Sequence, residues 1–237
     1  MTKPKVLLII PAYNEEKSIK KTVESILPTH YDYIVIDDGS ADNTKHVLQQ
    51  NHYNFISLSS NLGIGGAVQT GYKYALYNNY DIAIQFDADG QHNAEYIKDL
   101  IQPILDQEAD LVIGSCFISK DKSNRRASKI RQFGVYFLSG VIKLFSGKLL
   151  YDPTSGFRAA NRKVIECFAD SYPLEYPEPI SNYELLKSHR YKIKEVPVRM
   201  NRRTAGHSSI HSWKSIYASV SVLLSIIILS FGRSKYD

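Results

Sequence analysis

The sequence contains little cysteine and begins with no long apolar run. Its two cysteines, Cys116 and Cys167, are far apart and lack the spacing of metal ligands, so nothing indicates a disulfide framework and a reducing compartment fits. The apolar run Val6–Ile10 is too short for a secretory signal peptide and ends at Pro11. We therefore expect the protein to remain in the cytoplasm.

Internal repeats and low-complexity linkers are also absent. The 237 residues are 43% hydrophobic and 22% charged, which is ordinary globular composition and suits one large α/β domain. Lys and Arg outnumber Asp and Glu by 29 to 24, and we expect no nucleic acid partner. Composition alone favours a solvated basic surface. The basic ranges Lys120–Lys148 and Lys187–Arg203 follow an acid-rich first half, so one half is also suited to a cation and the other to phosphates or anionic lipid.

Short apolar runs alternate with segments of helical periodicity in the first half of the chain. We predict strands over 6–10, 33–36, 55–58, 82–86 and 111–114, and helices over 18–27, 42–50 (with Asp42 as N-cap), 67–77 and 94–105. This alternation predicts an α/β fold with a mainly parallel, Rossmann-like sheet covered by helices on both faces. Because polar residues follow several strands, we expect one ligand crevice at the strands' carboxyl ends.

The pattern is looser after Gly114. We predict helices over 130–145, 163–169 and 180–188, a strand over 193–198, and loops at 152–158 and 176–179. The last segment, 213–231, is strongly apolar and is bracketed by basic residues, but its uninterrupted part is shorter than the roughly 20 residues of a full membrane span. We therefore predict a domain over 1–212 and an apolar C-terminal helix over 213–237, either membrane-associated or a marginal transmembrane anchor.

The central chemical feature is Asp87-Ala-Asp89, which follows a buried strand directly. Two carboxylates one residue apart can share a divalent cation, and oxygen ligands suit Mg²⁺ or Mn²⁺. Such a cation would also bridge a diphosphate and neutralise charge on a leaving group. A lone Asp-x-Asp is weak on its own, but the preceding strand and the following Gly90-Gln91-His92 strengthen the prediction.

Two further loops are suited to a nucleotide. Asp37-Asp38-Gly-Ser ends a strand, where a carboxylate can accept from a base or ribose, although a simple capped turn explains it equally well. Gly63-Ile-Gly65-Gly66 precedes a helix, so it can approach a phosphate or merely form a tight turn. A dinucleotide fingerprint would follow the first strand rather than the third, which argues against an NAD enzyme.

Six segments in this order resemble the family-2 glycosyltransferases of the GT-A type, above all the polyprenyl-phosphate sugar transferases. They run over nearly the whole chain, from Val6 to about Ser209: Pro11-Ala-Tyr13-Asn14-Glu15, Asp37-Asp38-Gly-Ser, Asn61-Leu-Gly63-Ile-Gly65-Gly66, Asp87-Ala-Asp89-Gly-Gln91-His92, Asp152-Pro-Thr-Ser-Gly-Phe-Arg158 and Arg203-Thr-Ala-Gly-His-Ser208. The resemblance implies metal-dependent, inverting transfer of a sugar from a nucleoside-diphosphate sugar to a polyprenyl phosphate.

The resemblance also implies a role for individual residues. The expected nucleotide-sugar site comprises Pro11, Tyr13, Glu15, Asp38, Gly65 and Asp87. Metal binding falls to Asp87, Asp89 and Gln91, and catalysis to Asp89 and to Asp152 near the acceptor or sugar. The acceptor phosphate would meet Arg131, Arg203 and Ser208, because the arginine fork matches phosphate oxygens.

The chain departs from the family pattern at two places. Relatives usually carry an arginine where this chain has Cys116, so a phosphate contact would have to come from Arg125 or Arg126 instead. Membrane-bound members often end in two full transmembrane helices, whereas this chain has at most one marginal span. We expect the protein on the cytoplasmic side of the membrane, held peripherally or by a single C-terminal anchor, with segments 130–145 and 213–231 meeting the lipid.

Other interpretations remain open on sequence alone. The acceptor is either a polyprenyl phosphate, already ionised near neutral pH, or a sugar hydroxyl of a lipid-linked or cell-wall glycan, which would need a base such as Asp152 or Glu178. A non-catalytic nucleotide-sugar binding subunit and a nucleotidyltransferase are weaker alternatives. Uridine diphosphate sugars are the expected donors in preference to guanosine diphosphate mannose.

Overall fold

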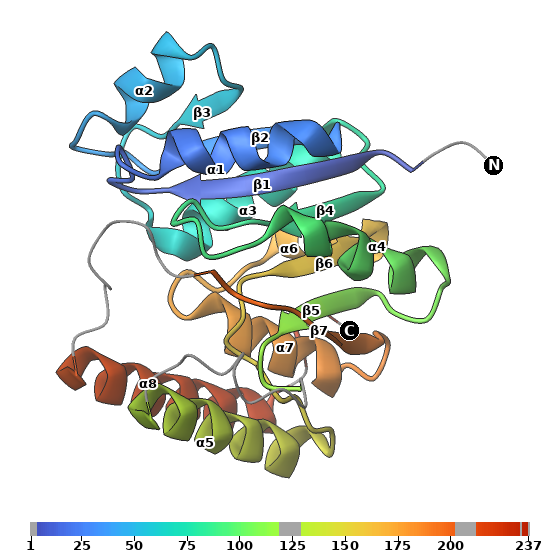
Figure 1. The fold of residues 1–237 in the computed structure, drawn as a ribbon. Coiled ribbons are helices and arrows are strands. Elements are labelled where there is room, and N and C mark those ends of the chain that lie inside the picture. Colours follow the sequence, from blue (N-terminus) through green and yellow to red (C-terminus); the bar gives the residue numbers. More distant parts are fainter. Residues whose placement is uncertain (1–3, 119–128, 202–211, 233, 237) are drawn as a thin grey trace.

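A seven-stranded sheet forms the centre of the computed structural model, which describes residues 4–118, 129–201, 212–232 and 234–236. The strand order is β3-β2-β1-β4-β6-β5-β7 (Figure 1). The strands are β1 (Val6–Ala12), β2 (Asp32–Asp37), β3 (Phe55–Ser57), β4 (Ile82–Gln85), β5 (Leu111–Ser115), β6 (Arg158–Asn161) and β7 (Ile193–Pro197). The helices are α1 (Ile19–Ile26), α2 (Thr44–Gln50), α3 (Gly63–Tyr77), α4 (Ile97–Leu105), α5 (Lys129–Ser146), α6 (Arg162–Asp170), α7 (Pro177–Lys187) and α8 (Ser212–Phe231), with 3-10 turns at Leu27–Thr29 and Ala94–Tyr96.

Strand β1 divides the hydrophobic core into two layers. All its residues are buried, and their alternation sends Leu7 and Ile9 into one apolar cluster and Leu8 and Ile10 into the other. The two clusters lie on opposite faces of the sheet, which is the arrangement expected when helices cover a parallel sheet on both sides. The α/β class predicted from the sequence is confirmed.

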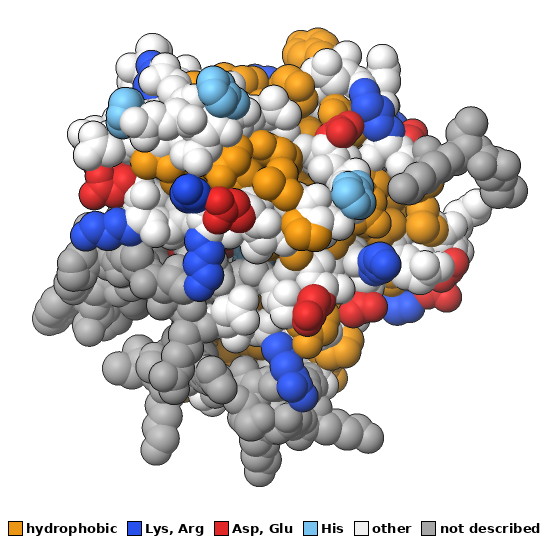
Figure 2. Space-filling model, turned by 45° about the horizontal axis from the view of Figure 1, so that its top comes forward, with side chains coloured by type: hydrophobic (Ala, Val, Ile, Leu, Met, Phe, Trp, Pro, Cys, Tyr) orange, Lys and Arg blue, Asp and Glu red, His pale blue; other side chains and the backbone are white. Residues whose placement is uncertain are grey.

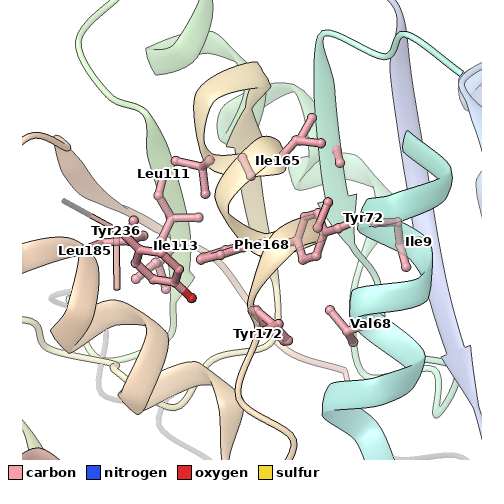
Figure 3. Packing of buried hydrophobic residues seen from close by; sticks show 14 of the residues in the cluster. Ile9, Val68, Tyr72, Leu111, Ile113, Ile165, Phe168, Tyr172, Leu185 and Tyr236 are labelled. Atoms are coloured by element: carbon pink, nitrogen blue, oxygen red, sulfur yellow. The ribbon is translucent and has the colours of Figure 1, made fainter. Parts of the chain in front are cut away.

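One of the two layers is rich in aromatic rings. Tyr72 of α3 packs edge-on against Phe168 of α6 with ring centroids 5.1 Å apart, and Phe168 also contacts Tyr172 at 4.9 Å and Tyr236 at 5.8 Å (Figure 3). Aromatic pairs of this kind contribute about 0.5–1.5 kcal/mol beyond the area that they bury. The rings therefore tie Tyr236, close to the last residue of the sequence, to the middle of the domain.

Strand β6 makes the sheet mixed and was not predicted. It pairs antiparallel with both β4 and β5, with Arg158 opposite Gln85 and Asn161 opposite Ile82. Because β6 runs against its neighbours, its first residue lies beside the last residue of β4. The loop that precedes β6 therefore reaches the same edge of the sheet as the loop that follows β4.

Three predicted boundaries need correction. Helix α3 begins at Gly63, so the glycines form its first turn instead of a loop before it. Helix α7 begins at Pro177, because proline suits the first helical position, and Glu178 is therefore helical and not in a rigid loop. Asn43 rather than Asp42 is the N-cap of α2, although the Asp42 carboxylate still accepts from the Thr44 amide at 2.9 Å.

Helices α5 and α8 lie side by side at one end of the molecule (Figure 1). Val222 and Ile226 of α8 are buried, and beyond the helix Ser234 and Tyr236 return to the domain. Both helices also expose apolar side chains, among them Phe133, Leu144, Leu224, Ile228 and Phe231. In the part of the chain that the structure describes, no helix combines the length and the apolar character needed to cross a membrane.

The face drawn in Figure 2 carries charges of both signs. Acidic and basic side chains are interspersed there, with hydrophobic side chains exposed between them (Figure 2). Among the described residues on this face, the charges therefore form a mixture and not a continuous patch of one sign.

Candidate active site

The loop after β4 carries Asp87 and Asp89 and is held at several points. The Asp87 amide donates to His92 Nδ1 at 2.9 Å, and Thr22 Oγ1 of α1 donates to the Ala88 carbonyl at 2.8 Å. The Gln91 amide donates to Asp89 Oδ1 at 2.9 Å, across a turn in which Gly90 has a φ of +77°. The backbone of this loop is therefore fixed before any ligand arrives.

His92 is buried directly behind Asp87. Burial lowers the pKa of His92 to about 4, against the raising influence of the Asp89 and Glu178 carboxylates, so the ring is neutral at physiological pH. It stacks on Phe157 with ring centroids 4.6 Å apart and meets the edge of Phe86 at 5.4 Å. The sequence motif contained His92, but its role could not be inferred from its position in the motif.

The loop 152–157, which precedes β6, approaches the Asp87 carboxylate closely. A Cβ atom built on Gly156 would lie 3.0 Å from Asp87 Oδ2 and 2.8 Å from Gln85 Nε2. A side chain at position 156 would therefore displace the Asp87 carboxylate or the Gln85 amide. This contact brings two of the six sequence motifs together, a proximity that the sequence did not predict because β6 was not recognised.

Hydrogen bonds to β5, β7 and α7 stabilise the loop 152–157. Glu195 of β7 accepts from the Tyr151 and Asp152 amides at 2.8 and 2.7 Å, and burial raises its pKa although these amides oppose the shift. Ser155 Oγ donates to the Gly114 carbonyl at 2.7 Å, at the end of β5. Asn182 Nδ2 of α7 donates to the Pro153 carbonyl at 3.0 Å. Neither Glu195 nor Asn182 was identified from the sequence.

Asp152 lies inside this loop and is only 3% exposed. Its carboxylate accepts from Thr154 Oγ1 at 3.2 Å and lies 3.7 Å from Cys116 Sγ. Cys116, where the family resemblance led us to expect an arginine, is thus in contact with Asp152. These contacts give Asp152 a part in shaping the loop, whereas the family resemblance implied a place next to the acceptor or sugar.

Beneath Asp87 lies a buried polar group that joins β4, β6 and α7. Gln85 Nε2 donates to Asp87 Oδ1 at 3.3 Å and to Glu178 Oε1 at 3.2 Å. Burial is the largest influence on the pKa of Glu178 and raises it. The Asp87 carboxylate raises this pKa further, and the Arg158 guanidinium opposes the shift without cancelling it.

Arg158 is fully buried and donates to the Ser155 carbonyl and to Ser181 Oγ. The sequence had offered Glu178 as a candidate base and Arg158 as part of a motif, but it did not predict that Gln85 would join Glu178 to Asp87.

The expected nucleotide loops after β1 and β2 are joined to each other. The Asn14 amide donates to Ser40 Oγ at 3.0 Å, and Asn14 Oδ1 accepts from the Ala41 amide at 2.8 Å. Tyr13, directly after β1, is exposed, whereas Pro11 is buried within β1. The Glu15 carboxylate accepts from Ser18 Oγ. The structure therefore places Tyr13 where a flat ligand can reach its ring.

Asp38 and Gly65 are occupied by contacts within the chain. Asp38 Oδ1 accepts from the Leu62 amide at 2.8 Å, and burial raises the pKa of this carboxyl although the Leu62 and Gly63 amides lower it. The Gly65 amide donates to the Leu174 carbonyl at 3.2 Å, and a Cβ on Gly65 would lie 2.1 Å from the Pro173 carbonyl oxygen. Close packing of the chain on itself thus explains this glycine without a bound phosphate.

The three expected acceptor-phosphate residues fall where side chains are not described. Arg131 belongs to α5, of which the structure describes the backbone at this point, and Arg203 and Ser208 lie outside the described residues, as do Arg125 and Arg126. The Asn201 amide donates to the Gln91 carbonyl at 2.8 Å. Asn201, the last described residue before residue 212, therefore lies beside the loop 87–91.

The donor atoms at this loop fit a hard divalent cation. Asp87 and Asp89 offer carboxylate oxygens and Gln91 an amide oxygen, the ligand types that suit Mg²⁺ and Mn²⁺. Within residues 4–118, 129–201, 212–232 and 234–236, no group of three or more His, Cys, Asp and Glu side chains is arranged to hold a metal. Protein sites for Mg²⁺ commonly use one or two carboxylates together with substrate phosphates.

Comparison with known proteins shows the family of the chain. Residues 7–168 match the family Glycosyl transferase family 2. A UDP-N-acetylglucosamine–dolichyl-phosphate N-acetylglucosaminyltransferase of Methanococcus voltae is 34% identical, covering 82% of this chain and 84% of that protein. An undecaprenyl-phosphate mannosyltransferase of Micrococcus luteus is 27% identical, covering 87% of both chains. The chain belongs to glycosyl transferase family 2, and it is a glycosyltransferase.

A solved structure supports the fold independently. The glucosyl-3-phosphoglycerate synthase of Mycobacterium tuberculosis, crystallised with Mn²⁺, UDP-glucose and phosphoglyceric acid, superposes with a TM-score of 0.71 over 96% of this chain and 80% of that chain. At 20% identity this likeness shows a shared fold. It confirms the GT-A type of sheet that the sequence motifs predicted.

Proposed function

We propose that the protein transfers a sugar from a nucleoside-diphosphate sugar to a polyprenyl phosphate, with Mg²⁺ or Mn²⁺ bound by Asp87, Asp89 and Gln91. The observation that carries this proposal is the loop 87–91, which several hydrogen bonds fix at the carboxyl end of β4. Ligands of open α/β sheets bind at this edge. The names of the Methanococcus and Micrococcus relatives support polyprenyl phosphate as the acceptor.

The donor is assigned to the loops after β1 and β2. Tyr13 offers an exposed ring for a base, Glu15 and Asp38 lie on the same joined loops, and Pro11 is buried in β1 just before them. We favour a uridine diphosphate sugar, because the Methanococcus relative is named for one. Gly65 is left out of this assignment, since its amide is used by Leu174.

The chemistry follows from where charge develops. A bound divalent cation would neutralise the negative charge on the departing nucleoside diphosphate. The chain itself would hold Asp87 and Asp89 in place and position the donor. It would also keep the loop 152–157 next to the Asp87 carboxylate. Because a phosphate acceptor is already ionised near neutral pH, it attacks without a base. Single displacement then inverts the anomeric carbon.

A sugar hydroxyl acceptor is the second candidate, and Glu178 is the observation that favours it. A hydroxyl needs a general base with a pKa near the operating pH, and burial raises the pKa of Glu178 toward that range. Gln85 Nε2 donates to both Glu178 and Asp87, so Glu178 is linked to the proposed metal ligand through a single side chain. A lipid-linked or cell-wall glycan would then be extended in place of a polyprenyl phosphate.

Labelled product analysis distinguishes the two acceptors. The protein is incubated with Mn²⁺, labelled nucleotide sugars and a short polyprenyl phosphate, and the lipid phase is treated with mild acid. We expect an acid-labile lipid carrying one sugar, formed most rapidly from a uridine diphosphate donor. A longer glycan with no labelled monoglycosyl lipid would establish the hydroxyl acceptor, and absence of transfer to either would contradict both.

We also propose that α5 and α8 attach the protein to the cytoplasmic face of the membrane. The two helices lie together and expose Phe133, Leu144, Ile228 and Phe231, while Lys143 and Lys148 are exposed near the end of α5. Apolar side chains beside basic ones are typical of helices that lie in the lipid headgroup layer. A lipid acceptor would be reached from the same surface.

The membrane proposal predicts a change in fractionation. Replacing both Ile228 and Phe231 by glutamate is expected to move most of the protein from the membrane pellet to the supernatant, because these side chains are 70% and 88% exposed and their exchange leaves the core intact. Tyr77→Glu, at a side chain 79% exposed on α3, is the matched control and should still pellet. Wild-type protein in the supernatant without detergent would refute the attachment.

A further inference from the structure

His92 contacts both the backbone and the carboxylate of one proposed metal ligand. The Asp87 amide donates to Nδ1 at 2.9 Å, and Nε2 lies 3.5 Å from Asp87 Oδ2. Since Nδ1 accepts a hydrogen bond, the proton of the neutral ring must be on Nε2, the nitrogen nearer the carboxylate. One imidazole therefore fixes the position of the Asp87 main chain and offers a donor to its side chain.

The plane of this ring is set by two phenylalanines from different segments. Phe157 of the loop before β6 stacks on His92 with an interplanar angle of 17°, and Phe86, next to Asp87, meets the ring edge at 81°. His92 itself is only 6% exposed. A ring enclosed in this way cannot turn away from Asp87 without opening the aromatic packing, so the orientation of both ring nitrogens is part of the fold.

We infer that His92 is a positioning residue that holds Asp87 in the geometry at which Asp87 and Asp89 face one cation. This inference rests on the proposed metal-dependent function. His92 does not coordinate the cation; it acts through Asp87, on the side away from the substrate. Groups that hydrogen-bond to metal-binding carboxylates commonly change metal affinity about 10- to 100-fold when they are removed.

Two substitutions separate the contributions of the ring. His92→Phe keeps a flat ring between Phe157 and Phe86 and removes both polar contacts. His92→Asn places an amide oxygen near the Nδ1 position, where it can still accept from the Asp87 amide, and removes the contact with Oδ2. A purely apolar role for His92 predicts that phenylalanine is the better substitute, whereas the positioning role predicts that asparagine is.

Calorimetry tests the inference on the full-length protein. Mn²⁺ is titrated in the presence of UDP into wild type, His92→Phe, His92→Asn and Asp89→Asn, with His46→Phe on the exposed face of α2 as the control exchange. We expect His92→Phe to weaken Mn²⁺ binding about 10- to 100-fold, His92→Asn to recover part of this loss, and the control to match wild type. Thermal melting of each variant shows that the differences arise in folded protein.

The possible failures of the inference and of the proposed function are distinct. If wild type binds Mn²⁺, Asp89→Asn does not, and both His92 variants bind within twofold of wild type, the positioning role is wrong while the metal site stands. If His92→Phe does not fold, His92→Asn alone decides, because wild-type affinity in that variant would overturn the role assigned to Nε2. If wild type itself binds no Mn²⁺ with UDP, the proposed function fails and the inference with it.

Discussion

Replacing Asp89 by asparagine is expected to lower kcat by about a hundred- to a thousandfold while the fold is retained. The asparagine side-chain oxygen can still accept from the Gln91 amide, as Asp89 Oδ1 does at 2.9 Å, so the loop keeps its shape. What is lost is one negative charge from a site whose proposed task is to hold a divalent cation at a leaving diphosphate. Steady-state turnover with Mn²⁺ and a uridine diphosphate sugar measures the effect.

The control for Asp89→Asn is the same chemical exchange at an aspartate outside the proposed site. Asp99→Asn changes an exposed aspartate in the first turn of α4 and should leave turnover unchanged. Its cost to stability is limited to the few tenths of a kcal/mol that an acidic side chain contributes at a helix N-terminus. Full turnover in Asp89→Asn would show that the metal assignment at this loop is incorrect.

Gly156→Ala is expected to lower kcat about a hundredfold with little change in stability. The added Cβ would lie 3.0 Å from Asp87 Oδ2 and 2.8 Å from Gln85 Nε2, which are the ends of side chains and can move aside. Their movement displaces the Asp87 carboxylate, and a misplacement of about 1 Å is enough for an effect of this size. Turnover, Mn²⁺ affinity and melting temperature together measure it.

Gly140→Ala provides the comparison for this exchange. A Cβ at Gly140 of α5 meets nothing within 4 Å, so this variant should keep its turnover and gain slightly in helix stability. Unfolding of Gly156→Ala together with its loss of activity would point to a structural role for the glycine. Normal activity in a folded Gly156→Ala would mean that Asp87 tolerates displacement, contrary to its proposed role as a metal ligand.

Local sequence patterns predicted the strands that run parallel and missed the one that does not. The apolar runs at β1, β4 and β5 are the signature of strands buried on both faces, and each was predicted within two residues. Strand β6 is only Arg-Ala-Ala-Asn and has neither alternation nor a branched apolar run. It is a strand because β4 and β5 offer hydrogen-bonding partners on either side, which is a tertiary cause that a short window cannot contain.

In the candidate site, too, features local in the sequence were predicted and features that depend on distant residues were not. Asp87, Asp89 and Gln91 were predicted because they adjoin one another in sequence at a strand end. Thr22, Glu195 and Asn182, which hold the loops, were not predicted, because each acts on a segment at least 29 residues away along the chain. Asp38 and Gly65 were predicted as nucleotide-sugar residues, and their hydrogen bonds within the chain, to Leu62 and Leu174, could not be predicted from the sequence.

Because β6 runs antiparallel to its neighbours, the proposed donor side and the proposed acceptor side of the site come from separate parts of the sequence. Loops that follow β1, β2 and β4 form the proposed donor side, and all are encoded before residue 92. The loop 152–157 reaches the same edge from the opposite direction, after α5 and an intervening stretch that makes no strand of the sheet among its described residues. Insertions or exchanges between β5 and β6 would therefore remodel the proposed acceptor side and the proposed membrane contact, while the register of the donor-side strands is kept. The proposed nucleotide-sugar site would in this way be open to diversification toward different acceptors.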